Sequence, residues 1–133
     1  MSTSKLKNLL ATLNHEEQAQ IILTFRDWMI ADFVFEVERG TETMPPGGID
    51  SMRNLDPEFE ARLQRAVDTK DSKVLKTGVM ELFRGLPTMQ KERNGARLNM
   101  FLFNRLPPHV FRLLYEAAGL TVENLRFDKN FPG

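Results

Sequence analysis

The side chains best suited to acid–base or metal chemistry are two histidines and a set of scattered carboxylates. His15 and His109 each lie near the start of a predicted helix, and neither has another histidine at metal-ligand spacing. Cysteine is absent, which excludes disulfides, thiol nucleophiles, zinc ribbons and iron–sulfur ligation. Motifs for nucleotide phosphates, calcium and a serine nucleophile are missing as well. The sequence therefore predicts surface histidines, no metal or other cofactor, and a protein that is not an enzyme.

Asp32 is the most unusual ionisable residue, because apolar side chains flank it on both sides. The segment 28–35 reads WMIADFVF. In a helix, desolvation would raise the pKa of Asp32 unless a cation or a backbone donor meets the carboxylate. One interpretation is a general acid or base. We favour a structural role instead, as an ion pair with an arginine or on one polar edge, because no partner residue has an assigned catalytic role.

The same segment is apolar on most sides, so it must be enclosed by its own domain or by another subunit. The chain holds ten phenylalanines and seven methionines, residue types that serve both cores and interfaces. We expect most of them in the core. The residues of this segment that we expect to bind a partner or a second copy of the chain are Trp28, Met29, Phe33 and Phe35.

A second candidate surface is basic and lies in the C-terminal half. Between residues 84 and 112 the only acidic residue is Glu92. Arg93 and Arg97 are four residues apart and therefore share a helix face. This face could remain solvated, meet an acidic protein, or follow a phosphate backbone. The basic residues assigned to partner binding are Lys91, Arg93, Arg97 and Arg105.

The elements that must position these residues are helices, marked by apolar residues at helical spacing and by end signals. Leucines predict a helix over residues 4–13, and Asn14 with Glu17 forms a capping-box pattern that starts the next one. Gly85 is expected to end a later helix in a left-handed cap, and Gly119 is expected at the end of another. Further helix starts are expected at Asp56, at Asp71 or Ser72, at Thr88 and at Pro107–Pro108, with a last turn capped by Thr121.

Residues 32–38 are ambiguous, because Phe33, Phe35 and Val37 also alternate with a period of two, as in a strand. A lone strand needs a partner, so a helix to about Glu38 is favoured over a minor β element. Residues 40–50 follow, with two prolines and three glycines, and predict a flexible loop. The expected fold class is all-α, a compact bundle of five to seven short helices in one domain spanning residues 1–133.

Length and charge agree with one soluble domain. The 133 residues are 41% apolar and 27% charged, a globular mix, and are too few for two stable domains. Residues 1–66 hold seven basic and eleven acidic side chains, and residues 67–133 hold the reverse, so we expect two halves that attract each other. A membrane span needs roughly 18 uninterrupted apolar residues, and a secretion signal needs an apolar stretch near the N-terminus. Both are missing, so we expect a cytoplasmic protein with no membrane partner.

These observations favour a non-enzymatic protein-binding factor, such as an adaptor, an assembly subunit or an inhibitor. It would act through the apolar segment and the basic face, on another protein or on a second copy of this chain. A nucleic-acid-binding protein that uses the basic half is the alternative, and it leaves the acidic half without a role. A motif-poor enzyme built on Asp32 and His109 is the least supported class. Small helical proteins without motifs are frequent among phage and mobile-element proteins, and that association is the only indication of a source.

Overall fold

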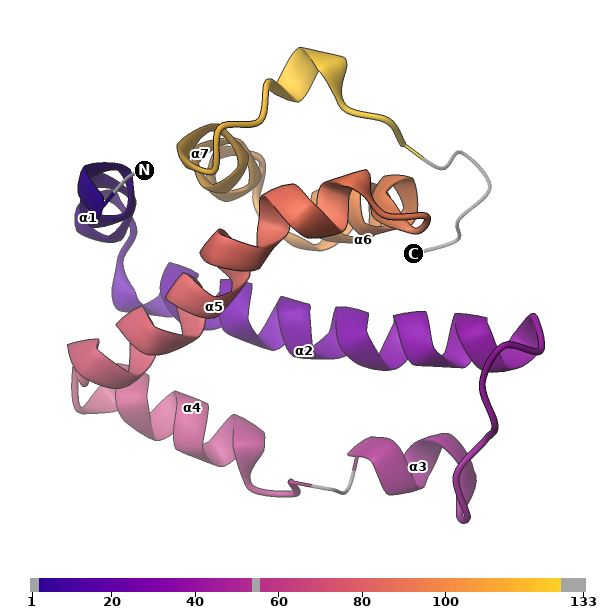
Figure 1. The fold of residues 1–133 in the computed structure, drawn as a ribbon. Coiled ribbons are helices and arrows are strands. Elements are labelled where there is room, and N and C mark those ends of the chain that lie inside the picture. The colour runs from indigo at the N-terminus through magenta and orange to yellow at the C-terminus, as the bar shows by residue number, and fades with distance from the viewer. Residues whose placement is uncertain (1–2, 54–55, 128–133) are drawn as a thin grey trace.

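The computed structural model describes residues 3–53 and 56–127, and every regular element in these ranges is helical (Figure 1). The elements are α1 (Thr3–Thr12), α2 (His15–Glu38), α3 (Gly48–Arg53), α4 (Phe59–Asp68), α5 (Ser72–Lys91), α6 (Gly95–Arg105), α7 (Pro108–Ala117) and a short 3-10 helix, η1 (Val122–Asn124). The expected all-α class is confirmed, and the seven α-helices agree with the expected five to seven. Two of them are long, since α2 has 24 residues and α5 has 20.

Helix α2 is the element against which most of the others pack. Figure 1 shows it running across the molecule, with α6 and α7 on one side and α3 and α4 on the other. Helix α5 crosses its N-terminal half, where a Cβ added to Gly78 would lie only 2.5 Å from Cδ1 of Ile22. The buried residues of α2 all lie in its first 14 residues, and they are Gln18, Ile21, Thr24 and Trp28.

The start of α2 is fixed by the capping box that the sequence predicts. The Asn14 side chain accepts a hydrogen bond from the Glu17 backbone at 2.8 Å, and the Asn14 backbone donates to the Glu17 carboxylate at 2.9 Å. The Gln18 amide donates to the carbonyls of Leu10 and Leu13, which ties the end of α1 to α2. His109, an exposed residue at the start of α7, contacts the Glu17 carboxylate at 2.5 Å. The first turn of α2 therefore joins three helices.

The ambiguous residues 32–38 are helical, so the minor β element is not formed. A strand here would have left backbone groups without a partner strand. The helix ends in two backbone hydrogen bonds over its last turn, from Gly40 to the Val37 carbonyl at 3.1 Å and from Thr41 to the Glu36 carbonyl at 2.9 Å. Gly40 has φ +87°, the left-handed conformation that this kind of helix end requires.

The predicted end of α5 at Gly85 is wrong, because α5 continues through Gly85 and Pro87 to Lys91. Gly119, by contrast, lies just after the end of α7 as predicted, and the structure shows it with φ +86°. Proline removes one hydrogen bond from a helix interior and costs about 3 kcal/mol there. Burial of the α5 stripe outweighs this cost, since Leu82 and Leu86 are fully buried.

Three other boundaries shift from their predicted positions. The helix start expected at Asp56 is not formed there, and α4 begins at Phe59. The helix start expected at Thr88 lies inside α5, and α6 begins instead at Gly95, after Asn94. The loop predicted over residues 40–50 is interrupted at Gly48, where α3 begins. The errors at Thr88 and Gly48 arise where short-range signals compete with packing against a distant helix.

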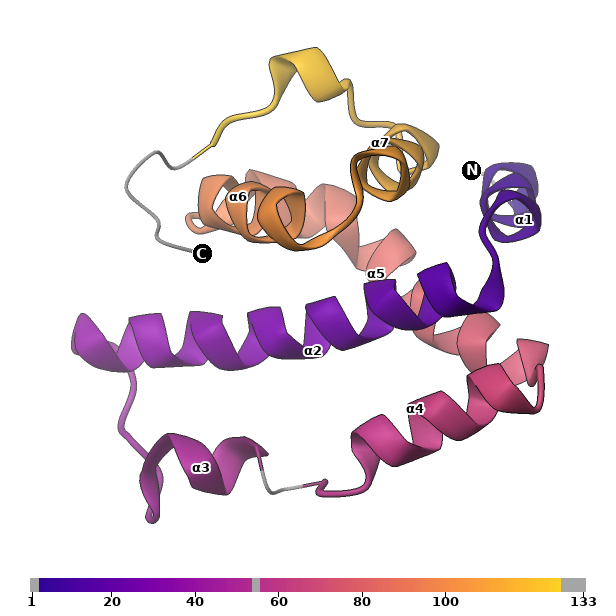
Figure 2. The same cartoon turned by 180° about the vertical axis from the view of Figure 1, so that it is seen from behind.

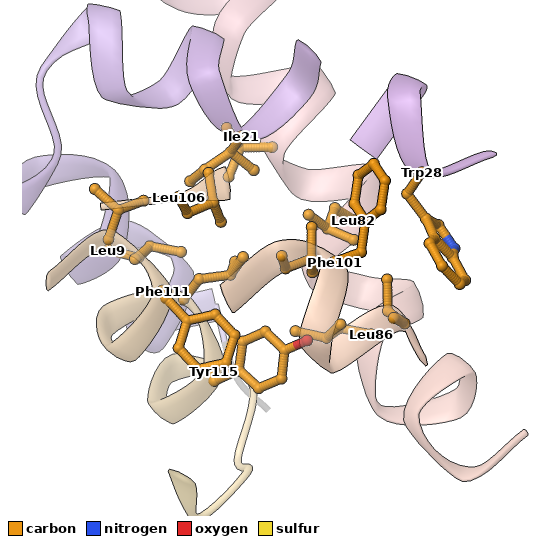
Figure 3. Packing of buried hydrophobic residues seen from close by; sticks show 14 of the residues in the cluster. Leu9, Ile21, Trp28, Leu82, Leu86, Phe101, Leu106, Phe111 and Tyr115 are labelled. Atoms are coloured by element: carbon orange, nitrogen blue, oxygen red, sulfur yellow. The ribbon is translucent and has the colours of Figure 1, made fainter. Parts of the chain in front are cut away.

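The main core lies where α1, α2, α5, α6 and α7 meet (Figure 3). Phe111 and Tyr115 stack with ring centres 4.3 Å apart, and Trp28 meets Phe101 edge-on at 5.5 Å. A smaller cluster between α4 and α5 consists of Leu63, Ala66 and Leu75. Trp28, expected to be shared with a partner, therefore belongs mainly to the core.

One polar side chain, Asn99, is fully buried beside this core. Its side-chain oxygen accepts hydrogen bonds from the Tyr115 hydroxyl at 2.9 Å and from the Gln90 amide at 2.5 Å. Its amide donates to the carbonyl of Arg126 at 2.7 Å. Asn99 thus connects α5, α6, α7 and the segment after η1, and burial raises the pKa of the Tyr115 hydroxyl above its usual value.

We predict that Asn99→Ala lowers the free energy of unfolding by about 1–3 kcal/mol, because the Tyr115 hydroxyl then remains buried without its acceptor. Tyr115→Phe should cost less, since Asn99 keeps its contacts with Gln90 and Arg126. Urea unfolding of both variants and of the double variant tests this. The double variant should lose less than the sum of the single losses, and strict additivity would argue against the shared network.

Two glycines provide a second test of the fold. A Cβ at Gly95 would lie 2.0 Å from the Gln90 carbonyl oxygen, whereas a Cβ at Gly85 would lie 3.2 Å from the flexible end of Met89. Gly85→Ala should therefore stabilise the protein by up to about 0.5–1 kcal/mol, the usual gain in a helix interior. Gly95→Ala should destabilise it strongly, because backbone must move. Denaturant unfolding of both variants measures the contrast, and a strongly destabilised Gly85→Ala would instead support a helix end at Gly85.

Candidate functional site

The C-terminal part of α2, residues 29–37, is here called the distal segment. None of its residues is buried, although it carries six aliphatic or aromatic side chains besides Met29: Ile30, Ala31, Phe33, Val34, Phe35 and Val37. Met29 is 58% exposed, among the largest values for an apolar side chain in the described chain. Figures 1 and 2 show this end of α2 reaching past α6 on one side while α3 lies on the other. The distal segment is therefore an apolar surface that the described chain covers only in part.

A groove of about 600 Å³ runs between the distal segment, the end of α5 and the start of α6. Its apolar lining consists of Phe25, Trp28, Met29, Phe33, Met89 and Leu98. Its polar lining consists of Asp32, Glu36, Glu42, Glu92, Arg93 and Asn94. Four carboxylates face one guanidinium in this lining, so we call it the acidic groove.

Asn94 holds the two α2 carboxylates of the acidic groove together. It directly precedes α6, and its amide donates to Asp32 at 2.7 Å and to Glu36 at 2.6 Å. The two acceptors are one helical turn apart and therefore share a face of α2. Asn94 is a site residue that sequence reasoning missed, because the helix start was expected at Thr88 rather than at this asparagine.

Glu36 is fully satisfied by its neighbours. Arg93 pairs with it at 2.8 Å and Arg39 at 3.5 Å, and the Thr41 hydroxyl donates to it. The hydrogen bonds from Thr41 and Asn94, followed by the charges of Arg93 and Arg39, lower the pKa of Glu36 to about 2. Glu36 therefore stays ionised.

The pKa of Asp32 shifts in the opposite direction, upwards. Its partial burial raises its pKa, the Asn94 hydrogen bond opposes this, and the nearby charges of Glu36 and Glu92 raise it further, while Arg97 lowers it. The expected ion pair with an arginine is not formed within the described residues, where Asn94 is the hydrogen-bond donor instead. An amide satisfies the carboxylate without neutralising its charge.

The basic residues predicted to form one face are divided between different contacts. Arg93 pairs with Glu36. Arg97 lies over the Phe35 ring at 3.4 Å, and Arg105 lies over the Phe101 ring at 3.8 Å. Lys91 is exposed, and it lines neither the acidic groove nor a second groove on the other side of the distal segment. The predicted residues therefore come together in part: Trp28, Met29, Phe33 and Arg93 line the acidic groove, whereas Phe35 and Arg105 line a second one.

This second groove, also about 600 Å³, lies on the other side of the distal segment, towards α4 and the end of α6. Its lining includes Ile30, Val34 and Phe35. Its charges are mixed, and Arg26 pairs with Glu60 at 3.1 Å to link α2 to α4. Apolar surface thus continues around the distal segment from one groove to the other.

The described residues form neither a metal-binding cluster nor a membrane-spanning helix. No cluster of three or more His, Asp or Glu side chains there is placed to hold a metal ion. Within the same residues, no helix has the length and apolar character needed to cross a membrane. Comparisons with protein-family models, curated proteins and solved structures gave no match to this chain.

We predict that Asp32→Asn stabilises the protein at pH 7. Folding raises the pKa of Asp32 above the unfolded value near 3.8. At a pH above both the unfolded and the folded pKa the side chain is ionised in both states, and its charge then lowers the free energy of unfolding. The variant keeps an acceptor for Asn94 and removes the charge. Thermal unfolding from pH 7 to pH 4 should show a higher Tm for the variant, with the difference shrinking as the pH falls.

Glu36→Gln is the matched control, with the opposite sign. Folding lowers the pKa of Glu36 to about 2 from 4.5, so its ionised form favours folding above pH 4.5 and this contribution disappears as the pH falls towards 2. Glu36→Gln should therefore lower the Tm at pH 7. A lower Tm for Asp32→Asn as well would show that the Asp32 charge is compensated in the folded protein.

Proposed function

We propose that this protein is a non-enzymatic protein-binding factor, such as an adaptor, an assembly subunit or an inhibitor, whose partner covers the distal segment of α2. The observation that supports this most directly is the incomplete cover of that segment: seven of its nine residues are apolar, and none of the nine is buried. A helix that is apolar on most sides needs an enclosing surface, and monomers seldom leave a continuous apolar patch open to water.

The composition of the segment fits a protein partner. Methionine and aromatic residues are enriched at protein interfaces, and Met29, Phe33 and Phe35 are of these types. Covering such surface contributes roughly 25 cal/mol per Å² of apolar area removed from water. The grooves on both sides of the segment offer concave surface for side chains of the partner.

The alternative, a nucleic-acid-binding protein, has weaker support. Arg93 already pairs with Glu36, and Arg97 and Arg105 lie on aromatic rings. Phosphates approaching Arg93 would also meet the carboxylates of the acidic groove. Like charges facing each other across an interface are unfavourable. Nucleic-acid binding, if present, should weaken steeply with salt, because each neutralised phosphate releases a counterion.

Site-specific photo-crosslinking tests the proposal. A photoreactive amino acid replaces Met29, or replaces Val74 as a control, which is 50% exposed but lies in the first turn of α5, away from the distal segment. We expect the Met29 probe to form a discrete protein product in nuclease-treated lysate of the native cell, and the Val74 probe to form none. Excess unlabelled wild-type protein should abolish the product.

Phe33→Glu serves as the specificity control, because Phe33 is only partly buried and the variant should remain folded by circular dichroism. Excess Phe33→Glu protein should leave the Met29 product unchanged. Equal products from both probes, or equal competition by both proteins, would contradict a partner site on the distal segment. A product that disappears on nuclease treatment would favour the nucleic-acid alternative.

A further inference from the structure

The acidic groove carries negative charge that the described chain does not neutralise. Of its four carboxylates, Glu36 is paired with Arg93 and Arg39. None of the other three, Asp32, Glu42 and Glu92, forms a salt bridge with a lysine or arginine among the described residues. Arg97 is close enough to influence Asp32 and lies over the Phe35 ring. The groove therefore combines an apolar wall with an excess of carboxylates.

The apolar wall and the carboxylates occur on the same stretch of helix. Met29 and Phe33 lie on either side of Asp32 along α2, and all three line the groove. Long basic side chains match this arrangement, because their aliphatic stems pack on apolar surface while the charged head reaches a carboxylate. The volume of about 600 Å³ is sufficient for such a side chain together with apolar neighbours.

On this basis, and resting on the proposed function, we propose that the acidic groove receives an amphipathic helix of the partner that carries one arginine or lysine within its apolar face. The cationic head lies against Asp32, with Glu92 and Glu42 at the rim, and the apolar side chains of the partner cover Met29 and Phe33. A cation at Asp32 offsets the cost of removing this carboxylate from water, which an amide donor alone does not.

The contacts within the protein illustrate the same chemistry. Arg97 lies over Phe35 and Arg105 over Phe101, so guanidinium groups already pack on aromatic rings around α2 and α6. In the acidic groove Phe33 is only partly covered. An arginine from a partner would repeat this pattern on the uncovered ring.

A second copy of this chain fits the groove less well. A symmetric dimer through this surface would place one acidic groove against the other, because two-fold interfaces bring the same patch of both subunits together. Asp32, Glu42 and Glu92 of both copies would then lie close together without added cations. The charge of the groove therefore favours a different, basic protein.

Three synthetic helical peptides test the inference. They share an amphipathic 15-residue sequence of alanine, glutamine and leucine, and differ at one central position of the apolar face, which is arginine, norleucine or glutamate. Trp28 is the single tryptophan of the protein and lines the groove, so its fluorescence reports binding. We expect the arginine peptide to bind at least about tenfold more tightly than the norleucine peptide, and the glutamate peptide to bind most weakly; a tenfold difference is the scale of one modest charge contact.

Variants of the protein assign the effect to the groove. Asp32→Asn should remove most of the preference for arginine over norleucine, while Glu81→Gln, which changes an exposed carboxylate of α5 that lines neither groove, should preserve it. Equal binding of the arginine and norleucine peptides to wild-type protein would overturn the inference. So would a preference that survives in Asp32→Asn, or no binding of the arginine peptide at about 1 mM.

The outcomes separate this inference from the proposed function. If arginine and norleucine peptides bind equally and both lose affinity for Phe33→Glu, the distal segment binds protein but the groove does not select a cation. If the Met29 photo-probe forms no specific product, the proposed function itself fails. Sedimentation velocity tests whether a second copy of this chain occupies the groove. A wild-type dimer that dissociates in Phe33→Glu would assign the groove to a second copy and overturn the inference.

Discussion

Helix α2 is longer than the body of protein available to bury it, and this mismatch determines the rest of the structure. At 1.5 Å per residue, its 24 residues extend about 36 Å, whereas the 10 or 11 residues of α4, α6 and α7 extend about 15 Å each. Helix α5 crosses α2 near Ile22, and the buried residues of α2 end at Trp28. The second half keeps its helical conformation with far less hydrophobic cover, so polar side chains must hold it in place.

Those polar contacts link the acidic half of the chain to the basic half. Asn94 holds Asp32 and Glu36, Arg93 pairs with Glu36, and the guanidinium of Arg97 lies on Phe35. The attraction expected between the two halves is therefore present at this contact. Exposed ion pairs contribute only about 0–1 kcal/mol each, far less than core packing. The distal segment is thus held more weakly than the first half of α2, which suits a surface that must adapt to another molecule.

Several helix starts and ends were predictable because their signals are local. The capping box at Asn14, the cap at Asp71 and the left-handed Gly119 each depend on a few neighbouring residues. Gly85 and Pro87 misled for the opposite reason, since burial of α5 against distant helices overrides their helix-breaking tendency. Sequence reasoning favoured a helix over a strand at residues 32–38 because a strand lacks a partner, and the same argument accounts for the structure.

The candidate site was predictable only in its apolar part. Met29 and Phe33 were identified from their position in an apolar run, and both line the acidic groove. Glu92 and Asn94 lie far from that run in sequence, and Glu42 lies beyond the helix end in the predicted loop, so no spacing rule connects these residues to the run. Likewise, nothing in the order of residues shows that Arg97 rests on Phe35 rather than facing solvent.

These long-range contacts reverse the sign of the surface that we propose faces a partner. Taken residue by residue, the C-terminal half is basic and suggests an acidic partner for Arg93 and Arg97. In the fold, α2 engages both of these arginines, and the carboxylates of the groove outnumber the cations that line it. A half-buried Asp32 that forms no salt bridge among the described residues lowers the stability of the fold, and so does an apolar segment with incomplete cover. Where several such local conflicts coincide, function is the usual reason that they persist. Here they coincide along two turns of one helix, and the charge that remains there is negative, so the physical complement of this surface is basic.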